Sequence, residues 1–185
     1  HSDHRRQRQM CIRDRPNSMK NLSSLYDIKL EKFHLYQDEE VMIARTGYTG
    51  ELGVEIISDA NKGLEIWNYF ISKGIQPIGL AARDTLRLEA GFNLYGSDMT
   101  VENNPYDSNL EWTVDQSEQD RDYIGKKALK HLQDTKNRLV GFYTDARGVL
   151  RSGTKVSFEG GEGVITSGTW SPTFKKNIGF CRITK

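Results

Sequence analysis

The sequence has almost no cysteine, no long apolar run and no excess of charge of either sign. Its two cysteines, Cys11 and Cys181, lie far apart, so neither a disulfide framework nor a cysteine-based metal site is expected. No stretch is apolar for long enough to cross a bilayer, and the polar, arginine-rich start lacks a secretory signal core. With 26 Lys and Arg against 25 Asp and Glu, the formal charge of +1 gives no overall attraction to nucleic acid or membrane. We therefore expect a soluble intracellular protein without a nucleic-acid or membrane partner.

Motifs of several common catalytic classes are also absent. The chain has no phosphate-binding loop, no zinc-ligand cluster and no pair of neighbouring catalytic carboxylates. The run Thr166-Ser-Gly-Thr-Trp-Ser-Pro172 contains serines but lacks the glycine-flanked pattern of a nucleophilic serine. The sequence therefore predicts no metal site and disfavours a serine nucleophile in this run.

Residues 1–20 contain few apolar groups and many arginines. Such a segment cannot bury enough surface to offset the entropy lost on ordering, so we expect it to be disordered. A basic arm for nucleic acid and a mitochondrial-type targeting segment are two alternatives. The acidic residues and the absence of an amphipathic period disfavour both, and a cloning or gene-calling extension is the preferred interpretation.

Alternating apolar residues predict a small sheet in the first part of the chain. Glu55 lies between two of them, Val54 and Ile56, and is expected to face the opposite side of the sheet. The alternation is carried by Leu30, Phe33 and Leu35, by Val41 and Ile43, and by Val54 and Ile56.

Two helices are predicted to follow. Ser58 or Asp59 can cap the first, and Gly74 can end it. The second is expected from about Leu80 to Ala90, ended by Gly91. Apolar residues recur at helical spacing in the first helix and are expected to pack in the core: Leu64, Trp67, Phe70 and Ile71.

The last third of the chain changes to short β-rich runs separated by glycine. Before it, Leu110–Val114 is expected to be a strand and 125–132 a short helix. The β-rich runs are 139–143, 154–158, 163–167 and 178–183. The predicted fold class is α+β, with a disordered leader at 1–20, an α/β domain at 21–134 and a small antiparallel sheet or barrel at 135–185.

Two separated blocks carry the candidate site. The first is Arg45-Thr-Gly-Tyr-Thr-Gly-Glu-Leu-Gly-Val-Glu-Ile56, whose glycines allow sharp turns or close approach. The second is Leu80-Ala-Ala-Arg-Asp-Thr-Leu-Arg-Leu-Glu-Ala-Gly91, followed by Asn93-Leu-Tyr-Gly96. They contain a strand carboxylate, Glu55, and a helix guanidinium, Arg83. Taken alone, Glu55 is better interpreted as a solvent-facing strand residue, and Arg87 could pair with Asp84, Glu89 or Asp98.

These blocks resemble the T-protein family of the glycine cleavage system, the aminomethyltransferases. Three further segments share the resemblance: Asp120-Arg-Asp-Tyr-Ile-Gly-Lys-Lys-Ala-Leu129, Gly148-Val-Leu-Arg151 and Gly163-Val-Ile-Thr-Ser-Gly-Thr-Trp-Ser-Pro172. The resemblance covers roughly residues 25–183. It implies transfer of the methylene carbon of an aminomethyl group from the lipoyl arm of the H protein to tetrahydrofolate, with release of ammonia and formation of methylenetetrahydrofolate. The resemblance also implies a role in glycine catabolism and one-carbon metabolism. It favours a location in the bacterial cytoplasm over the mitochondrial matrix.

The resemblance also assigns roles to particular residues. Glu55 and Arg83 are expected at the folate site, where a carboxylate can accept paired N–H bonds and a guanidinium can orient acidic groups. Tyr48, Tyr95 and Trp112 could line the pocket for the flat rings, although buried structural aromatics are an equal alternative. No catalytic residue is assigned, because the family's catalytic aspartate lies in an N-terminal part that this chain is expected to lack. By the same resemblance, the folate-binding domain at 21–134 is partial and the C-terminal β-barrel at 135–185 is truncated. The chain is therefore expected to be an incomplete enzyme, inactive alone.

Two other classes remain open. One is a tetrahydrofolate-dependent demethylase of the same superfamily, which shares the Gly-Tyr-Thr-Gly-Glu loop. The other is a folate-binding protein without transferase activity, as in the iron–sulfur-maintenance relative, whose cysteine-containing motif is missing here. The glycine-cleavage interpretation is preferred over both.

Overall fold

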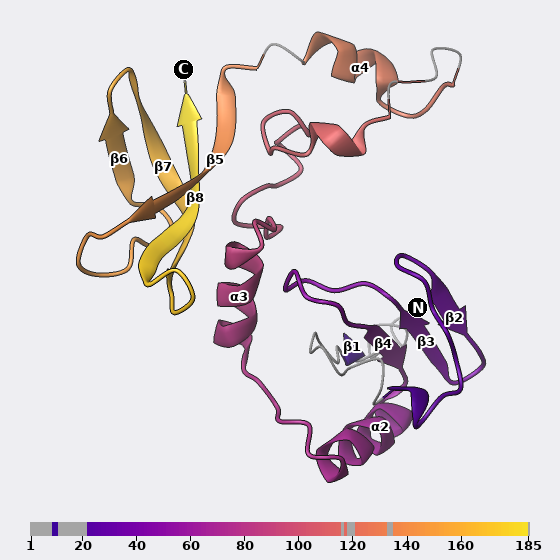
Figure 1. Ribbon diagram of the computed structural model, residues 1–185. Helices are drawn as coiled ribbons and strands as arrows, with labels where there is room; N and C mark the ends of the chain where they lie inside the picture. Colours follow the sequence, from indigo (N-terminus) through magenta and orange to yellow (C-terminus); the bar gives the residue numbers. More distant parts are fainter. Residues whose placement is uncertain (1–8, 11–21, 116, 118–120, 133–134, 185) are drawn as a thin grey trace. The chain divides into compact units, whose positions relative to one another are not determined.

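The computed structural model describes residues 9–10, 22–115, 117, 121–132 and 135–184 (Figure 1). The chain divides into two compact units, residues 1–90 and 91–185. Both contain helices and antiparallel strands, which confirms the predicted α+β class. The predicted boundary between 134 and 135 stays a prediction.

The first unit is built on a four-stranded antiparallel sheet in the order β1-β4-β3-β2. Its strands are β1 (Gln9–Met10), β2 (Leu35–Gln37), β3 (Val41–Ala44) and β4 (Glu55–Ser58). Within the predicted leader, the structure describes only the two residues of β1, which pair with Ile56 and Ile57 of β4. Cys11 and the other leader residues lie outside the described part of the chain.

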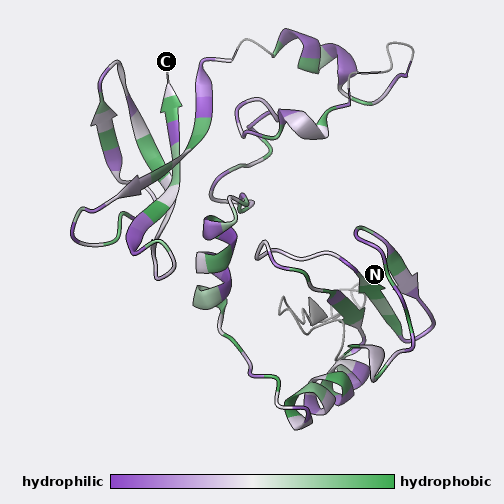
Figure 2. Ribbon diagram, viewed as in Figure 1, coloured by the Kyte–Doolittle hydropathy of each residue, from purple (hydrophilic) through white to green (hydrophobic). Residues whose placement is uncertain are grey.

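Helix α2 (Ala60–Ser72) packs its buried side into the core beside this sheet. Asp59 caps it, its Oδ1 accepting a hydrogen bond from the Lys62 main-chain N–H at 2.8 Å. Gly74, at φ +76°, follows the helix as expected. Hydropathy colouring shows apolar residues on β3, β4 and α2 (Figure 2). The core residues are Leu22, Leu30, Val41, Ile43, Val54, Ile56, Ile66 and Phe70.

The predicted core stripe of α2 is wrong for three of its four residues. Phe70 is buried, but Leu64, Trp67 and Ile71 are 60, 41 and 42% exposed. The buried side is instead formed by Gly63, Ile66 and Phe70. A Cβ at Gly63 would lie 3.2 Å from Ser58 Oγ, so this glycine faces the strand end at close range. The close approach at Gly63 sets the rotation of the helix, which the apolar spacing alone could not specify.

The expected strand around residues 30–35 is also corrected. Leu30 is buried, whereas Phe33 and Leu35 are 77 and 59% exposed. Phe33 has φ +66°, a left-handed conformation that interrupts an extended strand. Strand β2 therefore begins only at Leu35. In the β2–β3 turn, the main-chain N–H groups of Val41 and Glu40 donate to Asp38 and lower the pKa of its carboxyl group.

Helix α3 (Leu80–Glu89) ends as predicted, with Ala90 as its C-cap and Gly91 at φ +77°. The β3–β4 loop approaches this end of the helix. Gly50 has φ +85°, and a Cβ placed on it would lie only 2.8 Å from Ala90 Cβ. Glycine at position 50 is therefore required both by its backbone conformation and by the contact.

The second unit contains a four-stranded antiparallel sheet in the order β5-β8-β7-β6. Its strands are β5 (Asn137–Thr144), β6 (Lys155–Phe158), β7 (Gly161–Ser171) and β8 (Lys176–Thr184), each close to a predicted β-rich run. The antiparallel organisation is confirmed. Across residues 135–184 the sheet does not close into a barrel, because β5 and β6 form its two edges.

Two shorter elements precede this sheet. Helix α4 (Lys126–His131) falls within the predicted helix. The predicted strand at Leu110–Val114 is wrong: Glu111–Thr113 form the 3-10 helix η2. Its bonds run from Thr113 N to Leu110 O and from Val114 N to Glu111 O. The segment satisfies its backbone locally, and no strand of the described residues pairs with it.

The segment 91–110 is tied to the sheet by a buried carboxylate, Asp98. Its Oδ1 accepts hydrogen bonds from Thr166 Oγ1 at 2.5 Å and Ser167 Oγ at 2.7 Å. Successive side chains of a regular strand face opposite sides, but the register of β7 against β8 shifts between Ile165 and Ser167. This irregularity lets two consecutive hydroxyls reach one carboxylate.

Main-chain carbonyls of the same segment accept bonds from β8. Arg182 donates from one guanidinium nitrogen to Asp107 O at 2.9 Å and from another to Asp98 O at 2.5 Å. Leu139 N at the start of β5 also donates to Asp107 O at 2.9 Å. These bonds explain why the segment after Gly91 belongs with the C-terminal sheet.

Replacing Asp98 with alanine is expected to lower the free energy of unfolding by about 2–4 kcal/mol, because buried donors lose a charged acceptor. Urea unfolding followed by tryptophan fluorescence measures the change. Asp145→Ala is the matched control, since Asp145 forms an ion pair with Lys176 but is 76% exposed; it should cost less than about 1 kcal/mol. Equal losses in the two variants would contradict the anchoring role.

Gly50→Ala should destabilise the first unit by at least about 1 kcal/mol more than Gly74→Ala. Both substitutions place alanine at positive φ, which costs about 1–2 kcal/mol, but only the one at Gly50 also meets a neighbouring Cβ. The same urea experiment on the two variants measures the difference. A smaller loss for Gly50→Ala would show that loop and helix are not in contact.

Candidate functional site

The candidate site is centred on the loop that joins β3 to β4. Glu55, the first residue of β4, is half-buried between the fully buried Val54 and Ile56. Its side chain therefore lies on the sheet face opposite the core, as predicted. Thr46 Oγ1 donates a hydrogen bond to Glu55 Oε2 at 2.6 Å. This is a short O–H···O hydrogen bond.

Thr46 is a residue of the site that the motif analysis missed. The register pairs Ala44 of β3 with Glu55 of β4. Thr46 comes two residues after Ala44, so it continues on the same face and lies diagonally across from Glu55. The strand register could have identified Thr46 from the sequence. Using that signal requires knowing which residues pair in the β3–β4 hairpin.

The same loop brings an aromatic ring to Arg83. The Arg83 guanidinium carbon lies 4.6 Å from the centre of the Tyr48 ring, which is a cation–π distance. Both side chains are half-buried. Three of the predicted site residues, Glu55, Arg83 and Tyr48, are thus carried or contacted by this one loop.

Arg87 has a structural role. It is 1% exposed, and its Nε donates to Asp84 Oδ1 at 2.9 Å one turn earlier in α3. Of the three carboxylates considered for it, Asp84 is therefore a partner. A buried guanidinium requires such compensation, because an uncompensated buried charge is strongly destabilising.

The other two predicted aromatics lie in the second unit. Tyr95 forms an isolated bridge with Met99 and is 64% exposed, and Trp112 in η2 is 79% exposed. Neither ring is buried, so the alternative that these two residues are buried structural aromatics is wrong. A substrate role for Tyr95 and Trp112 stays a prediction.

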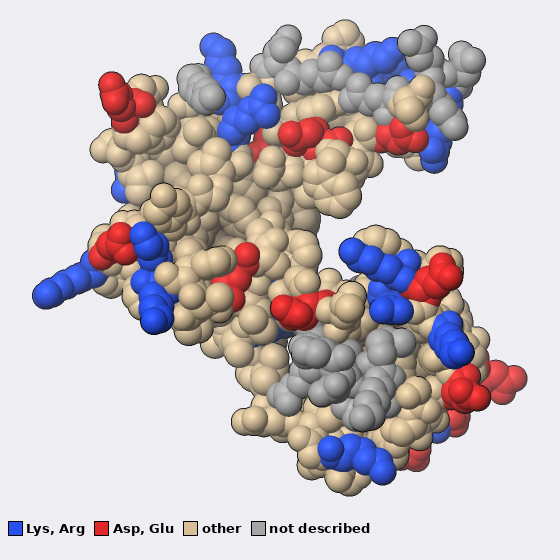
Figure 3. All heavy atoms as spheres, in the orientation of Figure 1, with Lys and Arg blue, Asp and Glu red and all other residues tan. Residues whose placement is uncertain are grey.

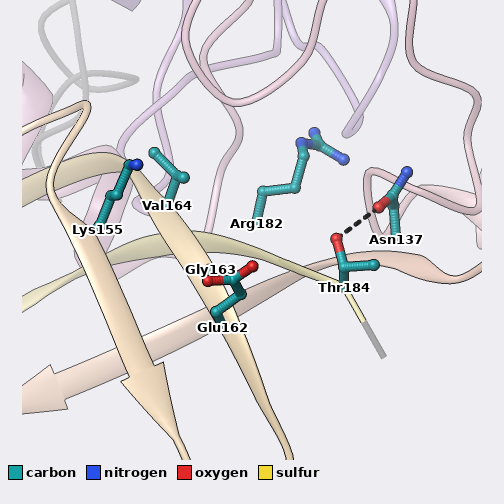
Figure 4. Close-up of a pocket in the computed structure, with 7 residues that line it drawn as sticks. All are labelled: Asn137, Lys155, Glu162, Gly163, Val164, Arg182 and Thr184. Carbon is teal, nitrogen blue, oxygen red and sulfur yellow. Dashed lines mark hydrogen bonds between the residues drawn. The ribbon is translucent and has the colours of Figure 1, made fainter.

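A separate cavity of about 300 Å³ lies on the C-terminal sheet (Figure 4). Several of its polar groups bond to the protein itself. Thr184 donates to Asn137 Oδ1 at 3.0 Å, and Arg182 holds the two carbonyls described above. The cavity is lined by Asn137, Lys155, Glu162, Gly163, Val164, Arg182 and Thr184. Asn137, Thr184 and Arg182 are thus engaged in hydrogen bonds within the protein, and we assign no chemistry to the cavity.

The serine-containing run and the C-terminal cysteine also have structural roles. Ser167 donates to Asp98, and Ser171 Oγ accepts from Phe174 N at 2.9 Å. Cys181 is buried in β8, and burial raises the pKa of its thiol. These groups are unsuited to act as exposed nucleophiles.

The structure also shows how charged side chains are distributed over the surface. On the face drawn in Figure 3, acidic and basic side chains are interspersed. No helix in the described part of the chain combines the length and apolarity needed to span a bilayer. Over the same residues, His, Cys, Asp and Glu form no group of three or more that could hold a metal ion.

Two family models match the chain. Residues 16–118 match the GCVT N-terminal domain, and residues 137–185 match the glycine cleavage T-protein C-terminal barrel domain. Together they include the β3–β4 loop, α3 and the whole C-terminal sheet. The first match alone covers more than half of the sequence.

Curated relatives and a solved structure show the same likeness. The chain is 49% identical to an aminomethyltransferase of Stenotrophomonas maltophilia (strain K279a), over 78% of this chain and 39% of the relative. It is 48% identical to an aminomethyltransferase of Francisella tularensis subsp. tularensis (strain WY96-3418), over 78% and 41%. The structure resembles the crystal structure of glycine cleavage system aminomethyltransferase T from Bartonella henselae, with a TM-score of 0.76, 32% identity and coverage of 84% of this chain and 45% of that one.

The chain spans about 40% of the length of these curated relatives. The order of matched segments, the identity and the fold all agree with the resemblance seen in the sequence motifs. This chain therefore belongs to the glycine cleavage T-protein family, whose curated relatives here are named aminomethyltransferases.

Proposed function

We propose that this chain forms part of the substrate site of an aminomethyltransferase of the glycine cleavage system, and that the β3–β4 loop and α3 bind tetrahydrofolate. One observation carries the proposal: a half-buried carboxylate, Glu55 at the start of β4, accepts a hydrogen bond from the Thr46 hydroxyl beside a loop whose Tyr48 ring lies under the Arg83 guanidinium. The names of the curated relatives support the transferase class over a demethylase or a binding protein.

Glu55 and Arg83 supply complementary recognition chemistry. A carboxylate can accept two parallel N–H bonds from an amino-pyrimidinone edge such as that of a pterin. A planar guanidinium can bind the acidic groups of a folate through paired N–H donors. Tetrahydrofolate would supply the nitrogen that accepts the one-carbon unit, while these residues bind and orient it.

Orientation is the main contribution such residues make to the reaction. Holding two reactants in a productive geometry lowers the barrier by removing the entropy loss of a bimolecular encounter. A fixed negative charge near a developing positive charge stabilises it further. The proposed partner is the lipoylated H protein, whose aminomethyl arm would be the carbon donor, and a bacterial cytoplasmic location fits the bacterial relatives.

Glu55→Gln should weaken tetrahydrofolate binding by about 1.5–3 kcal/mol, or roughly 10- to 150-fold in Kd, because one charged acceptor becomes a neutral amide. Isothermal titration calorimetry under reducing conditions measures the affinity. Glu51→Gln is the matched control: it removes a charge from the same loop at an exposed position and should leave Kd unchanged. Unchanged affinity in Glu55→Gln would exclude a folate-binding role.

The isolated chain is expected to bind tetrahydrofolate without catalysing aminomethyl transfer, since it spans only about 40% of its curated relatives. Release of ammonia from aminomethylated H protein, measured with and without tetrahydrofolate, tests this. Full folate-dependent turnover by these residues alone would contradict the expectation of an incomplete enzyme. Methyl transfer from sulfonium or methylamine donors, without ammonia release, would instead favour the demethylase class.

A further inference from the structure

The carboxylate of Glu55 sits at the end of a flexible side chain, so its direction depends on a partner. Thr46 provides one through the 2.6 Å hydrogen bond to Oε2. The hydroxyl is neutral, so it orients the carboxylate without cancelling its negative charge. Thr46 is β-branched, and its restricted χ1 holds the hydroxyl in a direction set by the backbone.

The Arg83 guanidinium has a comparable partner in Tyr48. The guanidinium carbon lies over the Tyr48 ring, 4.6 Å from its centre, so an aromatic face lies under the cation. The N–H donors of a guanidinium lie in its own plane, where they can reach a carboxylate edge-on. The ring contact therefore restricts where the Arg83 guanidinium can lie.

Thr46 and Tyr48 are two residues apart in the same loop. The loop is fixed at one end by the β3–β4 register, which pairs Ala44 with Glu55. Further along, Gly50 lies against Ala90 at the end of α3. One short segment thus joins the strand that carries the carboxylate to the helix that carries the guanidinium.

We propose that Thr46 and Tyr48 are positioning residues, which act on tetrahydrofolate binding only through the orientation of Glu55 and Arg83. This inference rests on the proposed function. It adds two residues for which neither the relatives nor the motif analysis gives this role. Neither side chain needs to touch the ligand.

Paired substitutions test the role of each side chain. Thr46→Val removes the hydroxyl at nearly constant shape and should raise the Kd for tetrahydrofolate about tenfold, the factor lost with one hydrogen bond of about 1.4 kcal/mol. Thr46→Ser keeps the hydroxyl and should stay within about twofold. Tyr48→Leu should raise Kd about two- to fivefold, whereas Tyr48→Phe keeps the ring and should not.

A double-mutant cycle separates positioning from general loosening of the loop. If Thr46 acts through Glu55, adding Thr46→Val to Glu55→Gln should cause much less than the tenfold loss seen alone. Circular dichroism and urea unfolding of each variant show that the loop mutations leave the unit folded. Additive losses, or equal losses in Thr46→Ser and Thr46→Val, would overturn the inference.

The outcomes distinguish the inference from the function on which it rests. A weakened Glu55→Gln with an unchanged Thr46→Val refutes the positioning role and leaves the proposed function standing. Unchanged binding in Glu55→Gln, or no tetrahydrofolate binding by the unsubstituted chain, overturns the proposed function and the inference with it.

Discussion

The antiparallel register of β3 and β4 determines on which side of the sheet the candidate site forms. Ile43 pairs with Ile56 in the core, and Ala44 pairs with Glu55 on the other face. A slip of one residue would bury Glu55 and expose Ile56, because side chains alternate along a strand. The burial of these apolar residues, each worth about 1.5–3 kcal/mol, therefore also fixes the direction of the carboxylate. The direction of the Glu55 carboxylate thus follows from core packing together with the hydrogen bond from the Thr46 hydroxyl.

The second unit uses a polar contact for a similar purpose. Asp98 is fully buried, and its carboxylate accepts bonds from two adjacent hydroxyls of β7 and from the Leu94 main-chain N–H. Buried polar groups are tolerated when they are satisfied in this way. Arg182 adds bonds to carbonyls of the same segment. A long stretch with little regular secondary structure is thereby held against a sheet.

Local sequence patterns correctly predicted those structural features that depend only on residues close together in the chain. The face of Glu55, the end of α3 at Gly91 and the four C-terminal strands follow from periodicity and glycine placement. The rotation of α2 and the 3-10 helix at Glu111–Thr113 did not, because they depend on tertiary contacts and on the absence of a pairing strand among the described residues. The Thr46 contact likewise needs the pairing of two strands. The family resemblance rested on several separated blocks in one order, which are more specific than a single short motif. The comparisons confirm this resemblance.

The contact between Gly50 and Ala90 has a consequence for sequence variation within the family. The space between the loop and the end of α3 holds one methyl group, and Ala90 supplies it. A relative with a bulkier residue at the position of Ala90 would have to move its loop away from the helix, and Tyr48 with it. Position 90 should therefore stay small during evolution wherever glycine is kept at position 50, although the two positions lie far from each other along the chain.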